Sequence, residues 1–173
     1  MSSGFRPGGG RPNQPGPSGG GGAQNRGPRT ANPANSLFDV TKPDAELFDQ
    51  IAEQQADVFA QLDFRKRIPA SQLRRFFGEV KELFRRFNSQ TAANANKNEE
   101  EIYRQFIEPQ FRMIRSKVAY TLGRQGSSSV PREFADFLSE GIRKVDSAKN
   151  FRRFVLHFEA VVGFMYGKDA LSK

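Results

Sequence analysis

The stretch that most constrains the fold lies between Asn150 and Tyr166, and it has more apolar surface than one helix face can use. Its main apolar residues recur at the i, i+3, i+4 and i+7 positions of one face: Phe151, Phe154, Val155, Phe158, Val162 and Met165. On the same helical wheel a second group falls on the opposite side, here called the Leu156 side: Leu156, Ala160, Gly163 and Phe164. We therefore expect a central helix that is covered on both sides. The Leu156 side is covered either by neighbouring helices of the same chain or by another protein chain.

This apolar stretch is unsuited to crossing a membrane. Four polar residues interrupt it well short of the roughly 18 uncharged positions that a span requires: Arg152, Arg153, His157 and Glu159. No apolar segment of the secretory type follows Met1. We expect no membrane partner and a cytoplasmic location.

The composition limits the chemistry available to the chain. With 173 residues, of which 36% are hydrophobic, one modest domain is expected. The absence of Cys excludes disulfides, thiolate catalysis and Cys-based metal sites. The single His, His157, lies within the apolar stretch, so we expect it to be structural. We expect no cofactor, no metal site and no enzymatic activity.

The positive charge is unevenly distributed along the chain, whose net charge is +8. Residues 1–38 contain four Arg and no acid, whereas residues 39–63 contain seven acids and one Lys, a net charge of −6. Residues 64–173 therefore carry +10. This segregation favours a polyanion as partner, and nucleic acid before membrane.

Residues 1–36 are rich in Gly, Pro, Ser, Asn and Arg, and this composition cannot bury enough apolar surface to offset the entropy of ordering. We predict a disordered tail here, followed by a helical domain over residues 37–173. The Arg and Gly spacing loosely resembles segments that hold single-stranded RNA, although the composition favours a passive solubilising tail.

Five helical segments and no strand follow the tail, which predicts an all-α fold, a compact bundle of about five helices. Pro43 suits a first helical position, Ser71 suits an N-cap, and Pro109 should kink or split the third segment. The polar residues from Asn88 to Asn98 are expected to form a loop. The expected helices cover about residues 43–64, 71–87, 99–122, 131–145 and 150–166.

Two groups of residues are candidates for contacting nucleic acid. On the second helix, Arg74, Lys81 and Arg85 lie within about 40° of one another and have no acid among them, unlike the neighbouring pairs Arg75–Glu79 and Glu82–Arg86. Such a stripe suits a phosphate backbone, although it also suits solvated surface.

The second group lies on the third helix and consists of Lys117, Tyr120 and Arg124, beside Met113. Two cations with a Tyr between them can grip a sugar-phosphate backbone and stack a base. The alternative is that Tyr120 and Met113 belong to the core, with the cations reaching past them to solvent.

Three segments, taken in order and spacing, resemble the small subunit of the Csm complex, the type III-A CRISPR effector. They are SQLRRFFGEV at 71–80, KVAYTLGR at 117–124 and FRRFVLHFEAVV at 151–162, and the resemblance covers about residues 40–168. By resemblance, the family's Lys-x-x-Tyr-x-x-x-Arg segment maps onto Lys117, Tyr120 and Arg124. Its Leu-Arg-basic-Phe-Phe segment maps onto Leu73 to Phe77. The Gly/Pro-rich tail departs from the family pattern.

The resemblance implies a small helical protein without catalytic activity, present in several copies beside the repeating backbone subunit. It implies four kinds of partner: guide RNA, target RNA, other subunits of the Csm effector complex and further copies of the chain itself. The RNA would lie in a channel lined by the small subunits, with target cleavage carried out by the backbone subunit. The competing hypothesis is a stand-alone helical adaptor or homodimer that binds RNA weakly through its tail.

Overall fold

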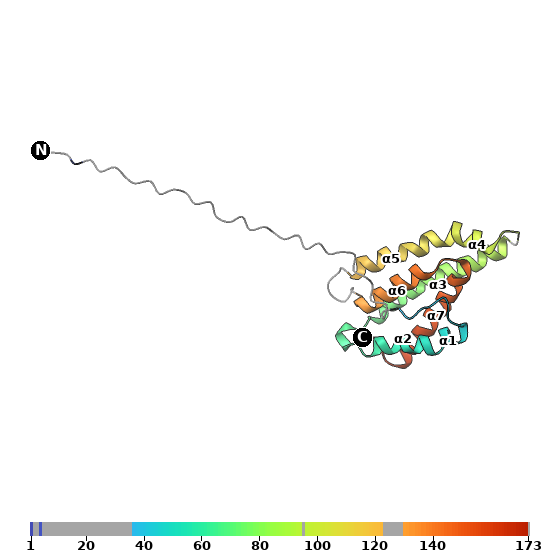
Figure 1. The fold of residues 1–173 in the computed structure, drawn as a ribbon, viewed down its shortest axis with the longest axis horizontal. Helices are drawn as coiled ribbons and strands as arrows, with labels where there is room; N and C mark the ends of the chain where they lie inside the picture. Colours follow the sequence, from blue (N-terminus) through green and yellow to red (C-terminus); the bar gives the residue numbers. More distant parts are fainter. Residues whose placement is uncertain (2–3, 5–35, 95, 123–129, 173) are drawn as a thin grey trace. The chain divides into compact units, whose positions relative to one another are not determined.

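The computed structural model describes residues 1, 4, 36–94, 96–122 and 130–172. These residues form an all-α fold, as predicted, and the helices are labelled in Figure 1. The predicted tail over residues 1–36 lies outside the described residues except for residues 1, 4 and 36. Arg124 also lies outside them. Among the residues described, the β-type pairing is limited to one bridge between Pro69 and Ser172.

The first expected helix is broken into α1 (Asp44–Phe48) and α2 (Gln50–Ala60) at Asp49, whose backbone leaves the helical region with φ −117° and ψ −94°. Pro43 is the N-cap of α1 with an extended ψ of 147°, so its predicted place as the first helical residue is wrong by one position. The predicted end near Phe64 is also wrong. α2 stops at Ala60, and a separate 3-10 turn, η2 (Phe64–Lys66), follows.

The second helix, α3 (Ala70–Ala93), is longer at both ends than predicted. Ser71 lies inside its first turn and makes no capping bond, because Pro69 with its extended backbone is the N-cap. Most of the predicted loop is helical, since Gln and Ala tolerate the helix well and nothing before Asn94 breaks it. The Thr91 hydroxyl donates to the carbonyl of Phe87 at 2.9 Å, which supports this last part of the helix.

The third segment is divided, as the position of Pro109 predicted. It consists of α4 (Glu99–Ile102), a π-helical turn η3 (Tyr103–Ile107) and α5 (Glu108–Leu122). Proline has no amide hydrogen for the regular helical bond and crowds the preceding turn. The wider π turn ends at Ile107, two residues before Pro109, and so occupies the turn that the proline ring would crowd.

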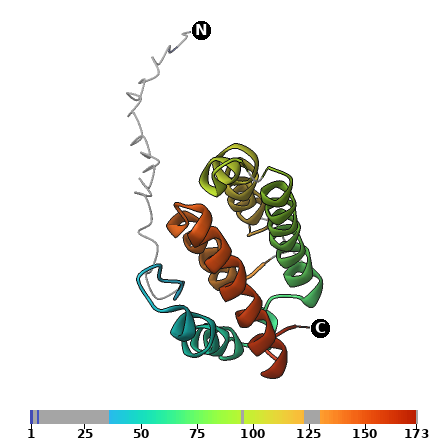
Figure 2. The same cartoon turned by 90° about the vertical axis from the view of Figure 1, so that its right-hand side faces the viewer.

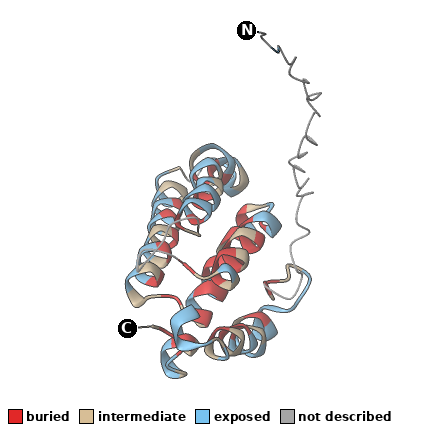
Figure 3. Cartoon of the chain, turned by 90° about the vertical axis from the view of Figure 1, so that its left-hand side faces the viewer, coloured by how far each residue is buried: buried red, intermediate tan, exposed pale blue. Residues whose placement is uncertain are grey.

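Helix α7 (Ala148–Gly167) organises the core together with α6 (Arg132–Lys144). α7 runs between the α1–α2 pair and α3, as Figure 2 shows. Its aromatic face is fully buried among the rings of other helices, with Phe151 5.0 Å from Phe111 and Phe158 5.4 Å from Phe137 between centroids. Buried residues gather on the inward sides of the helices, with exposed residues outside (Figure 3). The sequence prediction of a central last helix is therefore confirmed for this face.

Candidate nucleic-acid interface

The predicted cationic stripe of α3 is on the surface, but two of its members have acidic partners. The Nζ atom of Lys81 lies 2.9 and 3.0 Å from the two carboxylate oxygens of Glu159 on α7. Arg85 forms an ion pair with Glu82, one turn earlier. The expectation that the stripe has no acid near it is wrong for these two residues, because α7 and the neighbouring turn of α3 supply the acids.

Arg74 is the most available cation of the stripe. Its side chain is exposed, and it forms no ion pair with any residue in the described ranges. Arg85 has a side chain that is 75% exposed, so its pairing with Glu82 is a solvated surface pair that contributes little to stability. Both guanidinium groups are accessible to a phosphate.

Two further Arg side chains extend this surface. Arg75 lies 3.8 Å from Glu79, as predicted. Arg86 was expected to pair with Glu82, but instead donates to the side-chain oxygen of Gln110 on α5 at 2.7 Å. We define the α3 face as the charged residues of this helix, five cations and two acids, which leaves it positive: Arg74, Arg75, Lys81, Arg85, Arg86, Glu79 and Glu82.

The second predicted group lies on the outer side of α5. Tyr120 is 68% exposed and Met113 is 57% exposed, so both belong to the surface and the alternative that they are core residues is wrong. Lys117 reaches across to α3, where its Nζ lies 2.8 Å from a carboxylate oxygen of Glu79. This ion pair brings Lys117 beside Glu79 of α3, which is not one of the three predicted cations of that helix.

A groove of about 320 Å³ separates α3 from α5. Its floor includes Leu83 and Ile114, which are 6% and 1% exposed. Gly78 opens the α3 wall, since a Cβ added there would meet nothing within 4 Å. The remaining lining residues are charged or polar: Glu79, Glu82, Arg86, Gln110 and Lys117.

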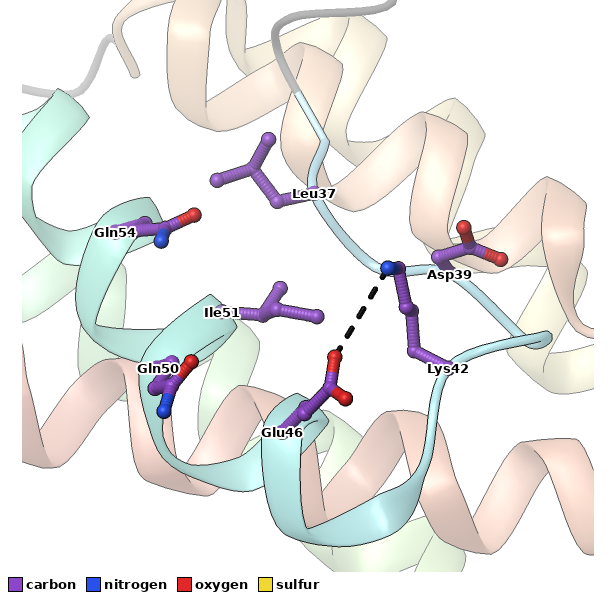
Figure 4. Close-up of a pocket in the computed structure, with 7 residues that line it drawn as sticks. All are labelled: Leu37, Asp39, Lys42, Glu46, Gln50, Ile51 and Gln54. Atoms are coloured by element: carbon purple, nitrogen blue, oxygen red, sulfur yellow. Dashed lines mark ion pairs between the residues drawn. The ribbon is translucent and has the colours of Figure 1, made fainter.

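A second groove, of about 290 Å³, lies between residues 37–42 and the α1–α2 pair (Figure 4). Its two acids, Asp39 and Glu46, outnumber its one cation, Lys42, which lies 3.9 Å from Glu46. Hydrogen bonds from Thr41 lower the pKa of Asp39, so this carboxylate stays charged. A groove with this charge is unsuited to a phosphate.

The Leu156 side of α7 is only partly covered by its own chain. Leu156 is 40% exposed, and a Cβ added at Gly163 would meet nothing within 4 Å. Ala160 and Phe164 are half-buried and pack against the core cluster. This side is therefore accessible at Leu156 and Gly163, which leaves the predicted subunit contact in place as a prediction.

His157 occupies a structural position, as its sequence context predicted. It is fully buried, with Nδ1 2.8 Å from the carbonyl oxygen of Leu47 and the ring tilted against Phe38 and Phe137. Burial lowers its pKa to about 4, so the ring is neutral near pH 7. In the described part of the chain, no group of three or more His, Asp or Glu residues is placed to hold a metal ion.

Several cations that contribute to the positive charge of residues 64–173 donate hydrogen bonds to backbone carbonyls within the fold. Arg112 donates to the carbonyls of Ile142 and Val145 at 2.6 and 2.7 Å, and so ties α5 to the C-terminal end of α6. Arg67 donates to the carbonyls of Ala60 and Asp169 at 2.6 and 2.8 Å. These contacts depend on tertiary neighbours, so no pattern in the sequence distinguishes such residues from surface cations.

Residues 36–40, which precede α1, are also held by cations that donate to their backbone carbonyls. Lys144 donates to the carbonyls of Ser36 and Phe38 at 3.2 and 2.7 Å. Arg153, only 8% exposed, donates to the carbonyl of Val40 at 2.7 Å and pairs with Asp44. The cationic surface is therefore smaller than the sequence charge implies, and α3, with five cations and two acids, has a larger positive excess than any other helix of the described chain.

These observations define a class of protein: a small all-α bundle whose outward chemistry is a cationic helix face. A search of the described helices for one long and apolar enough to cross a membrane finds none. The Csm2 Type III-A family matches the chain over residues 42–168, and the chain belongs to this family, the small subunit of the type III-A CRISPR Csm effector complex. Csm2 is a structural small-subunit family. No curated protein and no solved structure matches the chain in the corresponding comparisons.

Proposed function

We propose that this chain is a non-catalytic subunit present in several copies along a type III-A effector in the cytoplasm, where it stacks beside the backbone subunit. Its α3 face would line the channel that holds guide RNA and target RNA during antiviral defence. Membership of the complex follows from the family match. The observation that supports RNA contact is the excess of exposed cations on α3, above all Arg74 and Arg85.

The geometry of α3 suits a run of phosphates better than a single anion. Arg74 and Arg85 are eleven residues apart, which corresponds to about 16 Å along a helix. Guanidinium groups bind phosphate oxygens through paired donors, and they remain charged at all relevant pH values. Such contacts neutralise backbone charge without reading base sequence, as a guided complex requires when its guide supplies the specificity.

The predicted RNA-binding residues divide into two kinds by their partners. Lys81 and Lys117 bridge α3 to α7 and to α5 through Glu159 and Glu79, so RNA has to displace a carboxylate to reach them. We expect them to contribute less to RNA affinity than Arg74 and Arg85. Arg124, outside the described residues, keeps its proposed role on the strength of the family's Lys-x-x-Tyr-x-x-x-Arg segment alone.

A second copy or another subunit would contact the Leu156 side of α7, where Leu156 and Gly163 are accessible. Gly163 allows a close approach because it has no side chain. Contact here and RNA contact on α3 involve different surfaces, so they can be tested separately.

The experiment compares assembled complexes that carry Arg74→Ala, Arg85→Ala or both, with Arg143→Ala on α6 as the charge-matched control. Affinity for target RNA is measured against salt concentration. Each α3 change should lower the slope of log affinity against log salt by roughly 0.7 to 0.9, because one phosphate contact is lost. The control should leave the slope unchanged. A double variant that assembles normally and keeps the wild-type slope would show that α3 does not face the RNA.

A further inference from the structure

We propose that the groove between α3 and α5 holds a single unpaired nucleobase of the RNA whose phosphates lie on the α3 face. This inference rests on the proposed function, because it takes the adjoining α3 face as the phosphate contact. It assigns to the groove a ligand class, a base with an exocyclic amino group.

The charge arrangement favours a base over a phosphate inside the groove. Its lining has two acids, Glu79 and Glu82, and two cations, Arg86 and Lys117, so it is neutral as a whole. The charged residues of the α3 face that do not line the groove are all cations: Arg74, Arg75, Lys81 and Arg85. A neutral groove next to a positive surface is complementary to a nucleotide, because the base is neutral and the phosphate is anionic.

The walls offer space and apolar contact for a planar ring. The groove measures about 320 Å³, and Leu83 and Ile114 provide an apolar floor. Gly78 leaves the α3 wall open. Apolar and aromatic surfaces hold bases of any sequence through their faces.

The polar rim can distinguish between bases through their edges. Two cross-groove contacts span it, Lys117 to Glu79 at 2.8 Å and Arg86 to Gln110 at 2.7 Å. Glu82 has a carboxylate that accepts hydrogen bonds, and such groups accept from the amino group of cytosine. Uracil presents a carbonyl oxygen at the same position, which a carboxylate repels. We therefore expect cytosine to be preferred over uracil.

The test uses the full chain at low salt with two single-stranded RNA probes, oligo(C) and oligo(U), which differ in this amino group. Wild type should bind oligo(C) several-fold more tightly. Gly78→Leu should fill the groove, weaken oligo(C) binding by roughly tenfold or more and abolish the preference, with the salt slope unchanged. Gly78→Ala is the matched control and should retain the preference, since one methyl group leaves most of the volume free.

The outcomes separate this inference from the proposed function. If Gly78→Leu is folded and binds both probes as wild type does, while Arg74→Ala still lowers the salt slope, the groove does not hold a base and the proposed function stands. If Gly78→Leu instead loses other Csm subunits on purification with RNA binding intact, the groove holds a protein. If wild type binds neither probe, the groove does not hold a base, and the proposed function is decided separately by the salt dependence of the assembled complex. A Glu82→Gln variant should reduce the ratio of oligo(C) to oligo(U) affinity, and an unchanged ratio would also overturn the proposal.

Discussion

The close contact between α6 and α7 at Gly141 leads to a sharp prediction about stability. An ideal Cβ built on Gly141 would lie 2.3 Å from Cε2 of Phe154 and 3.1 Å from two further atoms of that ring. Phe154 is fully buried, with ring centroids of Phe38 and Phe111 at 5.2 and 5.6 Å. The ring has no free side into which it can move, so Gly141→Ala forces a displacement within the core.

The expected magnitude follows from two opposing effects. Ala in place of Gly favours a helix by about 1 kcal/mol, whereas overpacking a core costs about 1–3 kcal/mol. The overlap with an immobile ring places Gly141→Ala in the upper part of that range, for a net loss of about 1–2 kcal/mol. Gly78 provides the control, because it is also helical but has open space around the added methyl group. Gly78→Ala should therefore stabilise the fold by about 0.5–1 kcal/mol.

The assay is urea unfolding of the two variants and wild type, followed by circular dichroism. The two variants should lie on opposite sides of wild type, separated by about 1.5–3 kcal/mol in unfolding free energy, with equal m-values. If Gly141→Ala is as stable as wild type, α6 can move away from Phe154 without lowering the free energy of unfolding, and the packing argument is wrong. If both variants are more stable than wild type, helix propensity dominates and the contact with Phe154 is unimportant.

Three further predictions test other parts of the molecule. His157 has a folded-state pKa of about 4, below its ordinary value of about 6.5, so the unfolded chain takes up the proton first as pH falls and stability is lost in that window. Between pH 7 and pH 5 the unfolding free energy should fall by about 2 kcal/mol more in wild type than in His157→Asn; equal falls would show that the ring does not titrate as described. Gly163→Leu should weaken self-association or subunit contact, measured by sedimentation, and leave the chain folded; an unchanged profile would remove the Leu156 side from the interface. Deletion of residues 1–35 should leave the Tm within a few degrees of wild type, because their composition supplies little apolar surface; a larger drop in a thermal melt would contradict this.

The sequence predicted the fold class and the core well because both depend on local periodicity. The spacing of Phe151, Phe154 and Phe158 placed them on one face, and all three are fully buried. Helix ends were less accurate, as Ser71 and the residues after Phe87 show. A potential N-cap acts as one only if the backbone leaves the helix there, and this depends on where Pro69 and the following chain are held.

The surface could be predicted only in part, because the partner of a charged residue is often far away in the sequence. The sequence correctly paired Arg75 with Glu79, which are one turn apart. It could not show that Lys81 meets Glu159, or that Arg112 binds the end of α6, because those contacts join different helices. Local charge patterns show which charged residues share a helix surface, but they do not show which residues of other helices pack against that surface.

The sequence by itself determined that this chain is all-α, that its last helix is central, and that its later helices are positive, since helical periodicity and composition are properties of short segments. The family resemblance was also visible in three short segments. Only the tertiary structure decided which cations remain accessible at the surface, because a cation is held within the fold when folding brings a backbone carbonyl or a carboxylate next to it. It also decided that Tyr120 and the Leu156 side are accessible, since exposure depends on which neighbours cover a helix and not on the helix itself.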